Sequence, residues 1–306
     1  MWEYRNLWLP AFDPGPRVGV IMVDVDSFLS NGRAGRILVP VDFSPKVGLT
    51  LPRAIALAKL SHSAIWLLHV IDAVTCIGMG GNVPGALPEL HTRCSEALEE
   101  LAESVRKEGV GCTCLLREGD LDGQIREAIE GNKIDMLVLS TRAGTGMKGF
   151  SIVSAAERIL RKTTVPVLTL GACRKLRGWS ADGCVHVFYA TDLTPESVRS
   201  LQYARAIQRR FCAHFTVAHV LPKHASEEKV SQVMERLTGL LENPDDKAVV
   251  LRGSVGEAIC EGSAKAGADL VALGVKRHSL IREVLIGHHL REILSGAPCA
   301  VMSILQ

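Results

Sequence analysis

From Arg36 onward, short apolar runs alternate with longer segments in which apolar residues recur at helical spacing. The run from Ile134 to Leu139 has the length and composition of a parallel strand buried on both faces. A small-residue loop at 140–149, a helical pattern at 152–162 and a second apolar run at 165–170 follow it. Strand, loop, helix and strand in this order predict right-handed crossovers and a mostly parallel sheet covered by helices on both faces.

The same alternation extends over the residues that precede this unit. Helices are predicted at 49–60, where Pro52 would fall in the tolerant first turn, and then at 94–107 and 123–130. Gly and Pro residues between 78 and 88 predict a loop. Strands are predicted at 37–41, 64–70 and 112–117.

After a basic, glycine-containing linker, the pattern begins again with strands at 185–190 and 214–220 around a helix at 197–210. Asp192 follows Asp42 by 150 residues, and each comes directly after the first strand of its series. Later landmarks lie 134 residues apart, so the first series carries about 16 more residues, which we assign mostly to the 78–88 loop. The chain is therefore an internal duplication.

Composition narrows the class of protein. The 306 residues are 47% hydrophobic and 22% charged, which is enough for two globular domains. The formal charge of +2, with mixed signs, gives no indication of a nucleic-acid partner, and no apolar run reaches the roughly 18 residues of a membrane span. Nine scattered cysteines suggest reduced thiols and a cytoplasmic location, and residues 1–35 lack the features of a secretory signal.

Several short motifs recur in the same order in both halves. The first half contains ILVPVDFSP, WLLHVID and SAAERILRKTTVPVLTL, and the second contains VFYATDLTP, FTVAHVLP and IGHHLREILSGAPCAVMSI. On these motifs each half resembles a universal stress protein domain, and the chain resembles a tandem member of that family. We divide it into an N-terminal extension (1–35), a first domain (36–172), a linker (173–183) and a second domain (184–306).

The resemblance implies an α/β fold with two similar doubly wound domains. Each would be a five-stranded parallel sheet in the order 3-2-1-4-5, with helices on both faces. It also implies pairing through the last strand of each domain, here 165–170 and 299–305, which would give an internal pseudo-dimer within one chain. A stress-linked cytoplasmic role is implied, while further homo-oligomerisation and the identity of protein partners stay open.

Family members that hold ATP carry glycine, two residues, glycine, nine residues, and then glycine followed by serine or threonine. The corresponding positions in the first half are Ser140, Ala143, Val153 and Ser154, where only the terminal hydroxyl survives. In the second half they are Gly274, Arg277, Gly287 and His288, where two of the glycines survive.

These departures allow two interpretations. In one, the side chains of Val153 and Arg277 fill the phosphate position and binding is lost. In the other, the loops have drifted but still bind ATP, with Mg²⁺ present only if ATP is bound, through backbone amides, a cation or a hydroxyl. The residues that would supply these groups are Gly144, Gly146, Lys148 and Ser154 in the first half, and Arg277, His278 and His288 in the second.

Asp42 and Asp192 follow the first strand of their domains, where doubly wound sheets bind ligands. Each could contact a nucleotide ribose or base, or simply cap the helix that follows. Val70 and Val220 would line an adenine pocket, although plain core packing is the better explanation for both. His69 and His219 are interpreted as core histidines that satisfy their own hydrogen bonds.

No metal site is expected, because His288 and His289 diverge by about 100° on a helix and no third ligand is expected nearby in the sequence. No nucleophilic elbow, zinc-protease motif or Walker loop is present, so catalysis is not expected. The sequence leaves three hypotheses. These are a non-catalytic nucleotide-responsive module, a ligand-free interaction scaffold of the same fold, and an enzyme of the wider adenine-nucleotide fold group.

Overall fold

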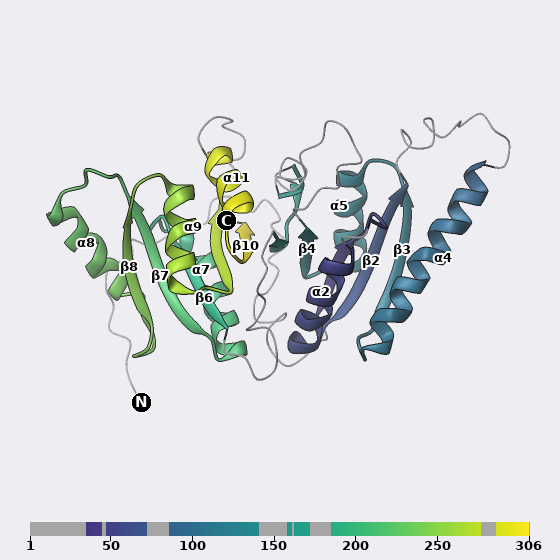
Figure 1. Cartoon of the computed structure of the whole chain (residues 1–306), viewed down its shortest axis with the longest axis horizontal. Coiled ribbons are helices and arrows are strands. Elements are labelled where there is room, and N and C mark those ends of the chain that lie inside the picture. The colour runs from purple at the N-terminus through teal and green to yellow at the C-terminus, as the bar shows by residue number, and fades with distance from the viewer. Residues whose placement is uncertain are drawn as a thin grey trace, which may run out of the picture.

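The computed structural model describes residues 35–44, 47–71, 86–140, 158–160, 162–171, 185–276 and 286–305. Figure 1 shows the first repeat on the right and the second on the left of one elongated molecule. The first repeat contains β1 (Arg36–Pro40), α2 (Val47–Ser61), β2 (Ala64–Ile71), α4 (Ala86–Lys107), β3 (Cys112–Glu118), α5 (Leu121–Asn132), β4 (Met136–Ser140) and β5 (Val167–Leu170). The second contains β6 (His186–Ala190), α7 (Ser197–Phe211), β7 (His214–Leu221), α8 (Glu227–Thr238), β8 (Lys247–Arg252), α9 (Val255–Ala266), β9 (Leu270–Val275), α11 (Ile286–Gly296) and β10 (Ala300–Leu305).

The strands form one ten-stranded sheet in the order β3-β2-β1-β4-β5-β10-β9-β6-β7-β8. Each repeat therefore has the predicted 3-2-1-4-5 order, and the predicted fold class is confirmed. β5 and β10 are antiparallel, with Leu168 opposite Met302, and they join the two halves at the centre of the sheet (Figure 1). The other neighbouring strands are parallel.

Alternation along the strands divides the core into two layers. In β1, Ile37 and Val39 join a cluster with α2, α4, α7 and α8, whereas Leu38 joins a cluster with α5, α9 and α11 on the other face. Each fully buried aliphatic side chain stabilises the fold by about 1.5–3 kcal/mol. Both clusters contain residues of β5 and β10, so the hydrophobic core continues across the junction between the repeats.

A repeated hydrogen bond fixes the start of the first strand in each half. The amide of Arg36 donates to Asp135 Oδ2 at 2.8 Å, and the amide of His186 donates to Asp269 Oδ2 at 3.0 Å. Asp269 follows Asp135 by 134 residues, the offset found in the sequence. The duplication is therefore preserved at the level of single contacts.

Some predicted boundaries were wrong. α4 begins at Ala86, so Pro88 lies in its first turn, where the absent N–H costs nothing, and not in the predicted loop. α2 begins at Val47, so Pro52 lies beyond its first turn. Because proline has no N–H, it cannot donate the usual helical hydrogen bond to the carbonyl of Gly48, which is an exposed residue. Residues 1–34 of the predicted extension (1–35) and all of the predicted linker (173–183) lie outside the described residues.

Candidate functional site

A cavity of about 330 Å³ opens at the carboxyl ends of β6, β7 and β9 in the second repeat. Ala190, Val220 and Leu273 line it from the sheet, and residues of α9 and α11, including Ile259 and Ile293, close its sides. Its volume lies within the range of about 300–1,000 Å³ that is usual for small-molecule sites. Its position is the one at which open α/β sheets bind ligands.

The loop after β6 is held by the Asp192 side chain. Asp192 Oδ1 accepts hydrogen bonds from the amide of Thr194 at 3.0 Å and from its hydroxyl at 2.7 Å. This turn places Leu193 in the left-handed region with a φ of 58°. The aspartate thus shapes the loop and does not cap α7, which begins only at Ser197.

The first repeat contains the same turn. The amide of Ser44 donates to Asp42 Oδ1 at 3.0 Å, and Phe43 has a φ of 55°. Within each repeat, the histidine at the end of the second strand donates a ring N–H to this loop. His69 Nδ1 lies 2.8 Å from the carbonyl of Val41, and His219 Nδ1 lies 2.8 Å from that of Thr191.

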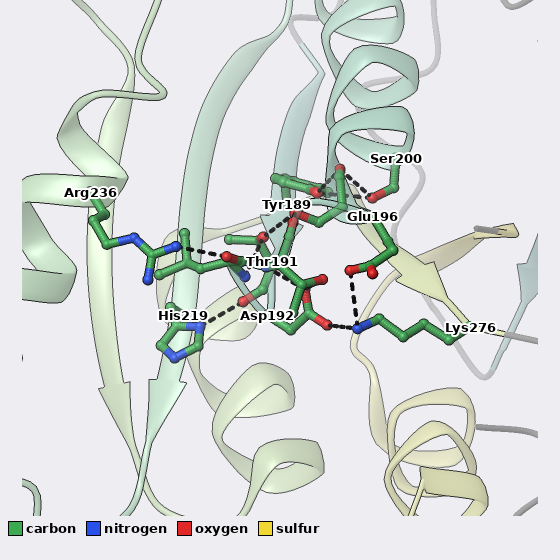
Figure 2. A network of polar contacts seen from close by, with 11 residues as sticks. Tyr189, Thr191, Asp192, Glu196, Ser200, His219, Arg236 and Lys276 are labelled. Carbon is green, nitrogen blue, oxygen red and sulfur yellow. Dashed lines mark hydrogen bonds and ion pairs between the residues drawn. The ribbon is translucent and has the colours of Figure 1, made fainter. Parts of the chain in front are cut away.

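A lysine that the sequence analysis did not select lies beside Asp192. Lys276 Nζ is 3.0 Å from Asp192 Oδ2 and 3.6 Å from Glu196 Oε2 (Figure 2). Burial alone would raise the pKa of Asp192, but the hydrogen bonds from Thr194 and Lys276 outweigh burial and hold that pKa below its usual value. The same contact with Asp192 raises the pKa of Lys276, so both groups are charged at neutral pH.

Behind this ion pair, buried hydroxyls connect the end of β6 to α7. Tyr189 donates to the carbonyl of Ser197 at 3.0 Å and shares a 2.9 Å hydrogen bond with the hydroxyl of Ser200 (Figure 2). Burial raises the pKa of Tyr189, which keeps the phenol neutral. On the outer side, Arg236 donates to the carbonyl of Leu193 at 2.7 Å and fastens the loop to α8. This wall of the cavity is therefore held by contacts to both α7 and α8.

The sequence pattern of the universal stress protein family matches this chain twice, at residues 34–170 and 185–304. The chain belongs to the universal stress protein family. A universal stress protein of Methanocaldococcus jannaschii is 26% identical over 155 residues, which cover 49% of this chain and 91% of the relative.

Solved structures support the same fold. A universal stress protein of Archaeoglobus fulgidus superimposes with a TM-score of 0.69 at 18% identity, over 90% of this chain and 99% of the other. A protein of Pseudomonas aeruginosa described as functionally unknown superimposes with a TM-score of 0.61 at 17% identity, over 92% and 94%. In this universal stress protein, every helix of the described residues is too short or too polar to span a bilayer.

In this universal stress protein, Asp192, Val220 and Gly274 all line the cavity. Gly287 lies in the first turn of α11 and His288 follows it; the next residue, His289, also lines the cavity. The equivalent residues Asp42, Val70 and Ser140 lie at the carboxyl ends of β1, β2 and β4. The remaining predicted site residues, Ala143, Gly144, Gly146, Ser154 and Arg277, lie outside the described residues.

The sequence analysis missed two groups at this site. Lys276 comes directly after β9 and two residues after Gly274, and this position alone could have marked it as a candidate. The statement that no third ligand lies near His288 and His289 was wrong, because Glu292 follows them by four and three residues. Its carboxylate lies near the imidazole of each histidine.

Proposed function

We propose that this universal stress protein is a non-catalytic stress-response module whose second repeat binds an adenine nucleotide. The observation that carries the proposal is the cavity that brings Asp192, Val220 and Gly274 together. The sequence resemblance places Gly274 in the family's ATP motif, and Asp192 and Val220 follow strands at the edge where doubly wound sheets bind ligands. A cytoplasmic, stress-linked role belongs to the same proposal and rests on family membership.

The chemistry of the cavity suits a nucleoside. Its apolar wall, which includes Val220 and Ile259, offers a surface for a purine ring. The Asp192 carboxylate can accept hydrogen bonds from ribose hydroxyls, and Lys276 provides a cation for phosphate. The first turn of α11 at Gly287 offers backbone amides nearby, and Mg²⁺ would enter only together with ATP.

We propose binding without catalysis because the sequence contains no nucleophilic elbow, zinc-protease motif or Walker loop. Within the cavity, Asp192 and Lys276 are paired with each other. A ligand that hydrogen-bonds to Asp192 would compete with Lys276 and release its ammonium for an anionic group. Binding would therefore change the contacts of the 192–196 loop, and a response could start from that loop.

The alternative function is a ligand-free interaction scaffold of the same fold. The specific observation that favours it is the same ion pair, since the Asp192 carboxylate is already satisfied by Thr194 and Lys276 without a ligand. In that case the cavity would be a relic of nucleotide binding, and the outer faces of the helices would carry the function.

The experiment is calorimetric titration of the full-length protein with ATP, ADP and AMP, with and without Mg²⁺. Mass spectrometry of any nucleotide released from the purified protein supports it. We expect Asp192→Asn to weaken binding by roughly tenfold or more, because a charge-assisted hydrogen bond is lost. Asparagine keeps the acceptor oxygen for Thr194, so the turn itself should persist.

Asp42→Asn is the matched control, because Asp42 makes the same turn in the first repeat. It should leave the affinity unchanged if the second repeat binds the nucleotide. Equal losses in both variants would move the site or divide it between the repeats. If none of the three nucleotides binds at millimolar concentration, the binding proposal fails and the scaffold is favoured.

A further inference from the structure

Three side chains near the start of α11 place metal-ligand atoms close together. The ligand atoms of His288, His289 and Glu292 all lie within 4.8 Å of one another. His288 Nδ1 is 3.3 Å from Glu292 Oε1, and His289 Nδ1 is 3.5 Å from Glu292 Oε2. Spacings of three and four residues put Glu292 beside both histidines on the helix surface.

These two distances are longer than the roughly 2.7–3.2 Å of an ordinary N–H···O hydrogen bond, and they are close to the separation of two ligands of one metal ion. Around a tetrahedral Zn²⁺ ion with bonds of about 2.0–2.1 Å, neighbouring ligand atoms are roughly 3.3–3.4 Å apart. Among the described residues, the buried atoms His289 Nδ1 and Glu292 Oε2 have no hydrogen-bond partner. Buried polar atoms are normally satisfied, so this pair needs an explanation.

The equivalent positions in the first repeat carry different charged residues. Glu292 follows Arg158 by 134 residues, and in the first repeat Arg158 binds the buried carboxylate of Asp122. The residue equivalent to Asp122 is Gly256. The second repeat thus has a carboxylate where the first has a guanidinium. Within the described part of the chain, the side chains that make ion-pair contacts with this carboxylate are the two histidines.

The surroundings hold Glu292 in place and leave the site open to solvent. A Cβ atom built on Gly256 would come within 2.3 Å of Glu292 Oε2, so α9 packs directly against this carboxylate. His288 is 67% exposed, which gives an ion a route of entry. His289 lines the nucleotide-sized cavity, so the free coordination positions of an ion would face water or the cavity.

We propose that His288, His289 and Glu292 form a binding site for a divalent transition metal of the Zn²⁺ type. Two imidazoles and one carboxylate suit Zn²⁺ and its neighbours better than Mg²⁺, which prefers oxygen ligands. With three protein ligands, one or more positions remain for water or for an anionic ligand group. The site stands whether or not the cavity binds a nucleotide.

The test is Zn²⁺ binding by the full-length, chelator-stripped protein, measured by competition with a chromophoric chelator under reducing conditions. We compare the wild type with Glu292→Gln and His289→Ala. We expect each variant to lose one equivalent of Zn²⁺ or to bind it at least tenfold more weakly. Glu292→Gln preserves volume, and circular dichroism checks that both variants are folded.

His91→Ala is the control, since His91 forms a histidine–glutamate pair with Glu118 in the first repeat. It should bind Zn²⁺ as the wild type does. Co²⁺ gives an independent readout, because the visible absorption of the wild-type complex should be lost in Glu292→Gln. Identical stoichiometry, affinity and Co²⁺ spectra in the wild type and both site variants would overturn the proposal.

Discussion

The two repeats share one backbone plan but place their charged groups differently. In the first repeat, Asp122 near the start of α5 accepts hydrogen bonds from Arg158 at 2.7 and 3.2 Å, and Lys162 lies 3.3 Å away. In the second repeat these positions are Gly256, Glu292 and Gly296. Among the described residues, this part of the scaffold thus holds an arginine–aspartate ion pair in the first repeat and a glutamate beside two histidines in the second. The first arrangement fixes a buried charge, and the second is the metal site that we propose.

The opposite face of the sheet shows a second difference. In the first repeat, Ile55 faces a groove of about 500 Å³ between α2 and α4. In the second, Arg205 occupies the equivalent position and is almost fully buried. Its guanidinium binds Asp246, Gln208 and the carbonyl of Leu240, which draws the 239–246 loop over α7. A buried charge network here takes the place of an open apolar groove.

The largest expected effect on the free energy of unfolding comes from Arg205→Ile, which places the residue of the first repeat at the equivalent position of the second. Removing the guanidinium would leave the buried carboxylate of Asp246 without its ion-pair partner. Loss of one partner of a buried ion pair typically costs about 3–5 kcal/mol. Urea unfolding should show that the free energy of unfolding of the single variant is lower by an amount of this order.

The double variant Arg205→Ile with Asp246→Ala tests the cause. Its free energy of unfolding should fall by clearly less than the sum of the losses in the two single variants. When both side chains are replaced, no buried charge is left without a partner. Additive losses would mean that the network is not the source of the difference between the repeats.

The next effect concerns the close contact between α9 and α11. In Gly256→Ala, the new Cβ would lie 2.3 Å from Glu292 Oε2 and 2.5 Å from Glu292 Cβ, so the helices must move apart. Overpacking of this kind costs about 1–3 kcal/mol. Gly131→Ala in α5 is the control, since nothing lies within 4 Å of its added Cβ. Thermal unfolding should show Gly256→Ala destabilised and Gly131→Ala unchanged or slightly stabilised.

A smaller effect on stability should distinguish Arg158 in the first repeat from the equivalent Glu292 in the second. Arg158→Ala leaves the buried Asp122 carboxylate with the weaker contact to Lys162, and we expect a cost of about 1–2 kcal/mol after allowing for the 40% exposure of Arg158. Glu292→Ala in metal-free protein should cost less, because the described residues place no Lys or Arg side chain in an ion pair with this carboxylate. Urea unfolding in the presence of a chelator measures both. A greater loss for Glu292→Ala would contradict the comparison.

Much of the fold could be predicted from the sequence, because strand and helix periodicities and two constant offsets repeat along the chain. The offsets correctly aligned Asp42 with Asp192, and the structure shows that both residues make the same turn. The sequence could not show that Lys276 reaches Asp192, because that contact depends on how β6 and β9 lie side by side. Glu292 was missed for a different reason. It lies four residues after His288 and three after His289, and such spacings bring side chains together only on a helix.

The smallest expected effect is the pH dependence of the Asp192 contacts. Because the pKa of Asp192 is lowered in the folded protein, the stabilisation from these contacts is present above the unfolded value of about 3.8 and is lost as the pH falls through the folded value. Asp192 is 49% exposed, so we expect only a few tenths of a kcal/mol. The stability difference between the wild type and Asp192→Asn, measured from pH 6 to pH 3, should shrink at the acidic end. Asp42→Asn, whose parent residue makes the same turn, is measured beside it. If the difference for Asp192→Asn stayed constant or grew on acidification, the lowered pKa of Asp192 would not contribute to the stability of the folded protein.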